Sequence, residues 1–345
     1  MIKDIEKILR QYYPTHWSKK DIEFFLGKRH LAVLSRSADQ GLNQPIRDLL
    51  FRGGKRIRPT LFLMLLQAFG LNYKKYLPYA YFLENIHNGT LVFDDIEDGS
   101  MLRRGHPTCY LRYGIDTAVN VGAAMHFMPL VLLLKKNQLI TTKQQLRIYK
   151  IYSEELINLH FGQAADIYWH KTHPNHINFN EYIEMTRLKT GSLMRMSVRL
   201  ACAVSNRSAE EERKLAEFAE LAGIAFQIKD DLLDLEAVDR KKFGKLLGND
   251  ISEGKLSLPV LFALKKLNNR DRKKLHNILK MHTLEKGVIN DAIILIKKTD
   301  AMHRARKIGD HYLIKSLGHL ALTSIPLKKQ AKVVEFIKSF IERDR

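Results

Sequence analysis

The chain has 345 residues, 45% of them hydrophobic, and a formal net charge of +20. A chain of this length and composition can bury a large core, and no Pro-, Gly- or Ser-rich linker interrupts it, so we expect a single domain over residues 1–345. Its only two cysteines, Cys109 and Cys202, exclude a disulfide framework and a cysteine-based zinc site, and they favour a reducing compartment.

Apolar residues recur at helical spacing along most of the chain, and long stretches lack the alternation typical of strands. From the N-terminus onward, the pattern predicts helices near residues 3–13, 20–37, 58–70, 76–98, 116–135, 143–170, 179–203, 208–236, 257–267, 285–305 and 327–343. Glycine and proline stand between these segments, as at Gly53-Gly54 ahead of Pro59 and at Gly105-His106-Pro107, where helices should end and begin. We therefore predict an all-α fold.

The sequence shows no segment that we expect to enter a membrane. Residues 1–7 mix charged and apolar side chains and lack the apolar stretch of a signal peptide. The longest apolar run, Phe127–Leu134, has eight residues and contains Pro129, whereas a spanning helix needs about 20. We predict a soluble cytoplasmic protein. The excess positive charge still allows contact with anionic lipid, nucleic acid or phosphorylated substrates.

Two short acidic motifs of the form D-D-x-x-D occupy Asp94–Asp98 and Asp230–Asp234. On a helix, the first and last aspartate of each motif lie on one face, one above the other. Basic residues follow both motifs: Arg103 and Arg104 after the first, and Lys241, Lys242, Lys245 and Lys255 after the second. Carboxylates beside cations predict a site for an anion carried on divalent metal ions. Magnesium fits, because it accepts a few carboxylates and takes its other ligands from water and substrate phosphates.

If both motifs bind one polyphosphate, the helices near 76–98 and 208–236 face each other across a cavity. That arrangement is a helix bundle with its site in the core. Leu83 and Ile86, which precede the first motif, then line the cavity below the metals. Such a cavity suits a hydrocarbon tail attached to a diphosphate.

Three candidates for anion binding lie near the first motif. The segment Gly53–Pro59 places three cations at a turn and a helix start, where backbone N–H groups favour phosphate; the alternative is a solvated basic loop. His87 lies two helical turns before Asp94 and on its face, so we expect substrate contact, although a lone histidine is more often structural. Arg103 and Arg104 can fold back over the metals, with guanidinium groups suited to phosphate; the alternative is a surface pair.

Further candidates lie towards the C-terminus. Lys189-Thr190-Gly191 falls within a predicted helix, where glycine costs about 1 kcal/mol and has a functional or packing reason; the alternative is a close helix crossing. Gln227 precedes Asp230 by three residues, so its amide oxygen should point into the cavity and could stabilise positive charge. The segment 244–255, with Lys245 and Lys255, predicts a lid that closes on phosphate; a plain surface loop is the alternative.

Seven segments in order carry a resemblance to a known family: GGKRIRP at 53–59, DDIED at 94–98, RRG at 103–105, GQAAD at 162–166, KTG at 189–191, FQIKDDLLD at 226–234 and GKLLGNDISEGKLSLP at 244–259. The chain resembles the trans-isoprenyl diphosphate synthases of the polyprenyl synthetase family. The resemblance implies an all-α, isoprenoid synthase-type helix bundle around a deep central cavity, usually in a homodimer. It also implies head-to-tail, magnesium-dependent condensation of an allylic diphosphate with isopentenyl diphosphate.

The resemblance also implies roles for single residues. The metal set, for about three magnesium ions, comprises Asp94, Asp98 and Asp230, with Asp95, Asp231 and Asp234 as further members. The allylic diphosphate would be held by Arg103, Lys189 and Lys255, with Lys245 helping to close the site. Isopentenyl diphosphate would be held by Lys55, Arg58, His87 and Arg104. Oxygens near Lys189, Thr190 and Gln227 would face the allylic cation.

Product length is predicted from the residues before Asp94. Short-chain members of the family carry aromatic residues four and five positions before the first aspartate, and this chain has Thr90 and Gly89 there. With no aromatic floor, a tail could extend at least one turn further, towards Ile86. We predict geranylgeranyl diphosphate or a longer product, with farnesyl diphosphate synthase as the alternative. A phenylalanine at Gly89 should then shorten the product.

Other classes of protein explain the sequence less well. A class I terpene cyclase replaces the second aspartate motif and does not need the basic motif at 53–59. A non-catalytic partner subunit of a synthase heterodimer typically loses one of these motifs, and all are present here. We find no recognition helix or aromatic-basic interleaving typical of nucleic-acid binding, so we predict no nucleic-acid partner. Contact with anionic membrane stays a hypothesis from the charge.

Overall fold

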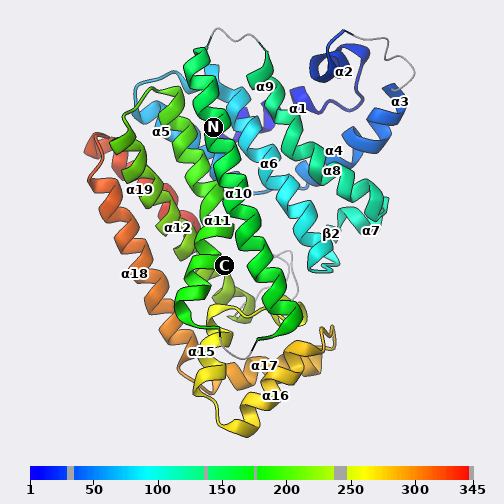
Figure 1. The fold of residues 1–345 in the computed structure, drawn as a ribbon, viewed down its shortest axis with the longest axis vertical. Helices are drawn as coiled ribbons and strands as arrows, with labels where there is room; N and C mark the ends of the chain where they lie inside the picture. Colours follow the sequence, from blue (N-terminus) through cyan, green and yellow to red (C-terminus); the bar gives the residue numbers. More distant parts are fainter. Residues whose placement is uncertain (29–34, 136–138, 175–176, 237–246, 342–345) are drawn as a thin grey trace. The chain divides into compact units, whose positions relative to one another are not determined.

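The structure is a computed structural model that describes residues 1–28, 35–135, 139–174, 177–236 and 247–341, and Figure 1 shows its fold. The chain divides into two compact units. Unit 1 comprises residues 1–150 and 203–206, and unit 2 comprises residues 151–202 and 207–345. The single domain predicted over the whole chain stays a prediction.

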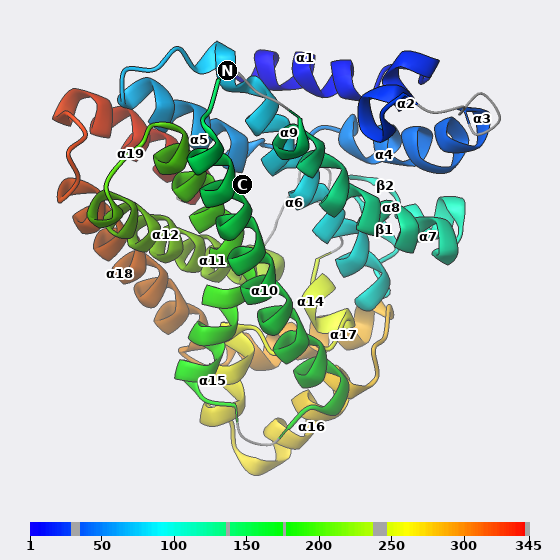
Figure 2. The same cartoon turned by 45° about the horizontal axis from the view of Figure 1, so that its top comes forward.

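Unit 1 is built from helices. They are α1 (Ile2–Tyr12), α2 (Lys19–Leu26), α3 (Ser35–Ala38), the π-helix η1 (Asp39–Asn43), α4 (Gln44–Leu50), α5 (Ile57–Ala68), the 3-10 helix η2 (Tyr73–Tyr76), α6 (Leu77–Glu97), α7 (Cys109–Tyr113), α8 (Ile115–Phe127), the 3-10 helix η3 (Met128–Leu130) and α9 (Val131–Leu134). Two short strands, β1 (Leu102–Arg103) and β2 (His106–Pro107), form an antiparallel hairpin after α6. Helices α6 and α8 lie side by side, as Figures 1 and 2 show.

Unit 2 is also helical. It contains most of α10 (Thr142–Thr172) and α11 (Phe179–Val204), together with α12 (Ala209–Glu236), α14 (Asn249–Ser252), α15 (Leu258–Lys266), α16 (Asn269–Lys280), α17 (Lys286–Lys297), α18 (Ala301–Ala321) and α19 (Leu327–Ile341). Helices α12 and α18 pack along each other (Figure 2). A core of buried aliphatic residues joins α12, α15, α16, α17 and α18.

The predicted all-α fold is confirmed, since β1 and β2 are the only strands in the part of the chain that the structure describes. The prediction of one helix over 20–37 is wrong, because α2 ends at Leu26 and Gly27 follows with φ 77°. The predicted helix over 285–305 is two helices, α17 and α18, separated by Lys298–Asp300. Helices α4, α7, α14 and α16 were not predicted, and α18 continues to Ala321, well past the predicted end at 305.

One segment bears on the prediction that no helix enters a membrane. Ile115–Leu134 is long and apolar enough to cross a bilayer by length and composition, and more than half of it is buried in the structure. The segment is not one continuous α-helix, because η3 with Pro129 separates α8 from α9. A buried core helix of a protein that does not enter a membrane can have the same length and composition, so this segment is weak evidence for a membrane span. Cytoplasmic localisation stays a prediction.

Candidate active site

Helix α6 positions the first aspartate motif at its C-terminal end. The helix begins with Pro78 in its first turn and ends at Glu97, and the N–H of Asp98 still donates to the carbonyl oxygen of Asp94 at 2.9 Å. Asp94 and Asp98 are partly exposed, whereas Asp95 is 1% exposed. Carboxylates at a helix C-terminus face the negative end of the helix dipole. The motif therefore needs compensating positive charge from its surroundings.

Arg103 supplies part of that charge. It lies on β1, and its Nε donates to Oδ1 of Asp95 at 2.8 Å while its Nη2 pairs with the same oxygen. Arg103 thus folds back onto the first aspartate motif, where Asp95 is its partner. These contacts favour a structural role for Asp95, and its place in the metal set stays a prediction.

A cluster of arginines surrounds His87 on α6. Nη1 of Arg58, at the start of α5, lies 3.1 Å from Nε2 of His87. Arg104 reaches the same region, where its Nη2 donates to Oδ1 of Asn88 at 3.1 Å. Burial and the charges of Arg58 and Arg104 hold the pKa of His87 well below its ordinary value. Because a guanidinium only donates, Nε2 of the neutral imidazole accepts and the proton lies on Nδ1.

The cluster is suited to an anion. Nδ1 of His87 is buried and has no hydrogen-bond partner in the described part of the chain. Burial and the charges of Arg56 and Arg103 lower the pKa of Arg104 to about 10 despite the opposing charge of Glu84. Excess positive charge and an unused donor are the features that a phosphate group would satisfy.

The basic motifs at 53–59 and 103–105 share an unusual backbone. Arg56 and Arg104 both have positive φ, 50° and 55°, a region that non-glycine residues seldom adopt and that concentrates at functional sites. Arg56 is one of the three cations of the predicted anion-binding segment, and its guanidinium instead binds the buried Glu84 at 2.6 Å. Lys55 is exposed beside it.

The three predicted product-length residues face different surroundings. Gly89 faces α8, since a Cβ there would lie 2.9 Å from Cβ of Met125 and 3.0 Å from the carbonyl oxygen of Gly122. An aromatic side chain at Gly89 has no room without moving α8, so the substitution predicted above cannot report on a cavity floor. Thr90 lies on the face of Asp94, one turn earlier, and Ile86 is fully buried.

Helix α12 carries the second aspartate motif in unit 2. Asp230 is partly exposed. Asp231 is buried and accepts hydrogen bonds from the hydroxyl of Tyr182 at 2.7 Å, Nε2 of Gln227 at 3.0 Å and the backbone N–H of Leu258 at 3.0 Å. Burial and the charge of Asp250 raise the pKa of Asp231 to about 7. These contacts favour a structural role for Asp231, whose place in the metal set stays a prediction.

Asp234 holds the start of α14. Its carboxylate accepts the backbone N–H groups of Asn249 and Asp250, both at 3.1 Å, and its carbonyl oxygen accepts the N–H of Gly248 at 2.9 Å. A carboxylate at a helix N-terminus satisfies orphan donors. Asp234 thus links the second motif to the segment that carries Lys255.

Lys189 and Thr190 each bind a neighbouring helix. Nζ of Lys189 lies 2.6 Å from Oδ2 of Asp166 on α10. Although burial opposes ionisation, Lys189 and Lys255 lower the pKa of Asp166. The hydroxyl of Thr190 donates to Oε1 of Gln227 at 2.9 Å. Asp166 lies in the GQAAD segment at 162–166, and no role was predicted for it. The separation of Asp166 and Lys189 along the sequence does not indicate that they form an ion pair.

Three glycines allow these helices to approach closely. A Cβ at Gly162 on α10 would overlap the backbone nitrogen of Lys189 and lie 2.9 Å from the carbonyl carbon of Leu188. A Cβ at Gly223 on α12 would lie 3.2 Å from Cα of Gly191. The alternative explanation of Gly191, a close helix crossing, is therefore confirmed.

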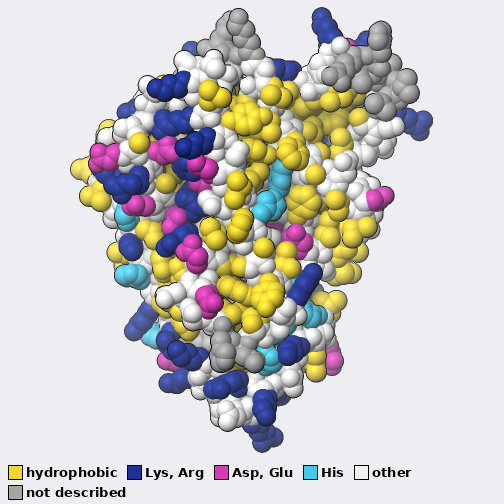
Figure 3. Space-filling model, in the orientation of Figure 1, with side chains coloured by type: hydrophobic (Ala, Val, Ile, Leu, Met, Phe, Trp, Pro, Cys, Tyr) yellow, Lys and Arg dark blue, Asp and Glu magenta, His cyan; other side chains and the backbone are white. Residues whose placement is uncertain are grey.

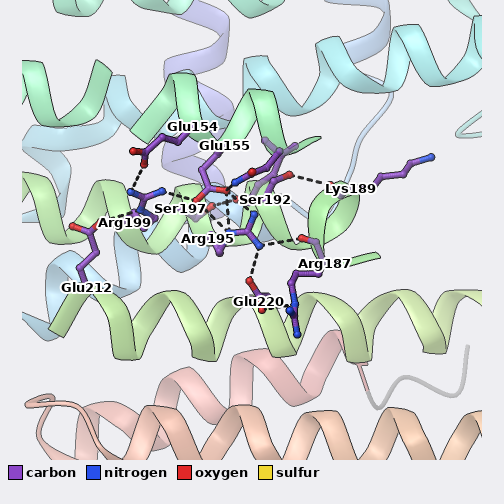
Figure 4. A network of polar contacts seen from close by, with 12 residues as sticks. Glu154, Glu155, Arg187, Lys189, Ser192, Arg195, Ser197, Arg199, Glu212 and Glu220 are labelled. Atoms are coloured by element: carbon purple, nitrogen blue, oxygen red, sulfur yellow. Dashed lines mark hydrogen bonds and ion pairs between the residues drawn. The ribbon is translucent and has the colours of Figure 1, made fainter. Parts of the chain in front are cut away.

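A charged network joins α10, α11 and α12 beyond Lys189, as Figure 4 shows. At its centre, Nε of Arg195 lies 3.0 Å from Oε2 of Glu155, and its Nη1 lies 2.7 Å from Oε2 of Glu220. Nη1 also donates to the carbonyl oxygen of Arg187 at 3.0 Å. Arg199 adds ion pairs to Glu154, Glu155 and Glu212. Because unpaired buried charges are costly, we expect this network to fix how the three helices pair.

The predicted lid is described only in part. Lys245 and the rest of 237–246 lie outside the described residues. Lys255 is half-buried; its Nζ pairs with Oε2 of Glu253 at 2.7 Å and its N–H donates to the carbonyl oxygen of Asp250 at 2.8 Å. Closure of the segment stays a prediction.

The donor chemistry fits magnesium. The partly exposed aspartates of the two motifs, Asp94, Asp98 and Asp230, offer only carboxylate oxygens, which hard divalent ions prefer. Among the residues that the structure describes, no three acidic, histidine or cysteine side chains form a metal-binding group by themselves. Magnesium bound at either motif would therefore complete its coordination with water and substrate oxygens, as it commonly does.

Comparisons with known proteins identify similar chains. Residues 39–296 match the family described as polyprenyl synthetase. A short chain isoprenyl diphosphate synthase of Methanocaldococcus jannaschii is 36% identical over 259 residues, which cover 75% of this chain and 77% of that protein. A geranylgeranyl pyrophosphate synthase of Dictyostelium discoideum is 31% identical over 304 residues, 87% of this chain and 95% of that protein. The solved geranylgeranyl pyrophosphate synthetase of Pyrococcus horikoshii has a TM-score of 0.80 at 27% identity, covering 99% of this chain and 96% of that one.

Proposed function

The chain belongs to the polyprenyl synthetase family, and we propose that it joins an allylic diphosphate to isopentenyl diphosphate to make geranylgeranyl diphosphate or a longer product. The observation that carries the proposal is the pairing on α6 of a carboxylate motif with the arginine cluster around His87. One group suits a diphosphate carried on metal, and the other suits a diphosphate bound directly by cations. A condensing enzyme needs both.

Different residues of the chain bind the two substrates. Arg58, His87 and Arg104, with Lys55, hold isopentenyl diphosphate. Arg103, Lys189 and Lys255, with Lys245, hold the allylic diphosphate. Asp94, Asp98 and Asp230 would hold magnesium, with Asp95, Asp231 and Asp234 supporting them. When bound, magnesium stabilises the negative charge that develops on the departing diphosphate.

The electron flow needs no protein base. The allylic C–O bond breaks and its electron pair leaves on the diphosphate. The double bond of isopentenyl diphosphate then supplies the pair for the new C–C bond, and a proton passes from the adjacent carbon to the departed diphosphate. Thr190 and Gln227 place their oxygens towards the developing positive charge, which such dipoles stabilise.

Incorporation of labelled isopentenyl diphosphate tests the activity. The purified chain with magnesium should form an extractable prenyl product from dimethylallyl, geranyl or farnesyl diphosphate. A cyclised hydrocarbon product would instead indicate a terpene cyclase. No incorporation with any starter, in the presence of magnesium, would contradict the proposal and leave the partner-subunit alternative.

We propose further that the chain forms a homodimer through α10. Leu146, Ile157, Phe161 and Tyr168 expose 67%, 58%, 71% and 59% of their surface. Spacings of four and eleven residues place them on one face of the helix, and Figure 3 shows hydrophobic side chains along it. Apolar patches of this kind mark interfaces. Sedimentation should give a dimer, and replacing Ile157 and Phe161 by glutamate should give a monomer; an unchanged dimer would contradict this interface.

Contact with anionic membrane is proposed for the basic end of unit 2. Residues 265–298 contain ten lysines and arginines against three acidic residues, and Figure 3 shows Lys and Arg side chains gathered in the region where Figure 1 labels α16. If this contact is electrostatic, binding of the chain to anionic vesicles should weaken as salt is added. Binding that does not respond to salt would argue against this contact.

A further inference from the structure

Three segments of unit 2 meet at Gly254, the residue before Lys255. Nε2 of His173, just after α10, lies 3.0 Å from the carbonyl oxygen of Gly254. A Cβ at Gly254 would lie 2.7 Å from Cε1 of His282, 2.8 Å from the carbonyl oxygen of Leu279 and 3.1 Å from Nε2 of His173. The backbone ahead of Lys255 is therefore enclosed by the residue after α10 and by the end of α16 with the two residues that follow it.

Both histidines adopt a backbone that their residue type disfavours. His173 has φ 46° and His282 has φ 45°, in the left-handed region where glycine is the usual residue. His173 ends α10, since its N–H donates to the carbonyl oxygen of Trp169 at 2.8 Å. Glycine would close this helix at lower cost. The polar contact of the imidazole at this position is the carbonyl oxygen of Gly254.

The imidazole of His173 is held as a neutral donor. Burial, together with the charges of His282, His276 and Lys280, lowers the pKa of His173 to about 4, against the opposing effect of its bond to Gly254. The rings of His276 and His282 pack edge-on against it, with centroids 5.8 Å and 5.7 Å away. A neutral ring whose Nε2 faces a carbonyl oxygen carries its proton on that nitrogen and donates it.

The C-terminal end of α10 also bears on the second lysine of the site. Asp166 lies within α10, seven residues before His173, which follows the helix. Asp166 pairs with Lys189 at 2.6 Å and also feels the charge of Lys255. The end of α10 thus carries a direct partner for Lys189, and the residue after it anchors the backbone next to Lys255.

We infer that His173 is a positioning residue for Lys255. Its hydrogen bond fixes the Gly254 peptide, and that peptide sets the direction in which the Lys255 side chain leaves the chain. The inference rests on the proposed function, in which Lys255 holds the allylic diphosphate. His173 itself does not touch substrate.

The test compares two replacements of His173. His173→Phe keeps a planar ring of similar size and loses the donor, whereas His173→Gln keeps an N–H donor. Losing one hydrogen bond corresponds to about a tenfold change. His173→Phe should raise KM for the allylic diphosphate about tenfold and leave KM for isopentenyl diphosphate unchanged. His173→Gln should recover most of the loss, and the control His276→Phe, whose ring packs on His173, should match the wild type.

A double-mutant cycle separates positioning from folding. If His173 acts through Lys255, adding His173→Phe to Lys255→Ala should cause no further loss. Equal kinetics for His173→Phe and wild type, or equal losses in the Phe and Gln variants that follow their unfolding temperatures, would overturn the inference.

Binding of inorganic diphosphate with magnesium, measured by calorimetry, decides the inference without turnover. His173→Phe should weaken this binding about tenfold, and unchanged binding would overturn the inference. A wild-type chain that binds diphosphate but never incorporates isopentenyl diphosphate would contradict the proposed function alone.

Discussion

Replacing Gly162 by alanine tests whether close packing of α10 on α11 sets the position of Lys189. The new Cβ would lie 2.9 Å from the carbonyl carbon of Leu188 and closer still to the backbone nitrogen of Lys189. Carbon atoms in proteins prefer separations of about 3.5–4.0 Å, so the backbones must separate by roughly 0.5 Å or more. Both obstacles are backbone atoms, which no rotamer change can relieve.

Two consequences should follow from this separation. Overpacking of this kind costs about 1–3 kcal/mol of unfolding free energy. The pair between Lys189 and Asp166 crosses the same contact at 2.6 Å, so we expect it to lengthen. A loss of about 1.4 kcal/mol in transition-state stabilisation lowers kcat/KM about tenfold.

Denaturant unfolding and steady-state kinetics measure the two effects. Gly318 on α18 provides a matched control, because a Cβ there meets nothing within 4 Å. Gly318→Ala should stabilise the chain by about 0.5–1 kcal/mol through helix propensity and leave kcat/KM unchanged. If Gly162→Ala keeps wild-type stability and activity, close packing of α10 on α11 does not set the position of Lys189.

Three further predictions concern product length, the charged network and pH. Thr90→Phe should shorten the main product, as chromatography of dephosphorylated products would show; unchanged length would place the cavity floor elsewhere. Arg195→Met removes one of the two arginines that pair with the buried Glu155 and leaves Arg199, so unfolding free energy should fall by less than the roughly 3–5 kcal/mol of a fully unpaired buried charge, and an unchanged unfolding free energy would contradict the network's role. The pKa of His173 falls from 6.5 to about 4 on folding, so its stability contribution is present above pH 6.5 and lost between pH 6.5 and 4. His173→Gln should make unfolding free energy less steep across that range, and an unchanged slope would count against the buried neutral ring.

The helices were predictable where apolar spacing and punctuation agree. Helix α6 is 77–97 against a predicted 76–98, and α10 is 142–172 against 143–170. The prediction failed at Gly27, because a positive-φ glycine ends a helix whose apolar spacing continues. Helix α16 was missed because its sequence is dominated by charge, and only Leu275, Ile278 and Leu279 are buried.

The candidate site was predictable as residue types and less so as contacts. The spacing of Asp94 and Asp98 follows from helix geometry alone. That Asp231 binds Tyr182 and Leu258 depends on segments far apart in sequence, which no local pattern contains. A glycine at position 89 is compatible with two explanations: a cavity that lacks an aromatic floor, or close packing against another helix. Only the position of α8 distinguishes them.

Mass spectrometry of the products from wild type and Asp94→Asn, assayed side by side, shows whether the chain makes a prenyl diphosphate and whether Asp94 is needed for it. With magnesium, isopentenyl diphosphate and farnesyl diphosphate, we predict geranylgeranyl diphosphate or a longer product from the wild type. Chelation of magnesium should abolish the product, and Asp94→Asn should lower its yield at least about a hundredfold. Product formation that survives chelation, or an Asp94→Asn variant as active as the wild type, would contradict magnesium-dependent condensation at the first aspartate motif.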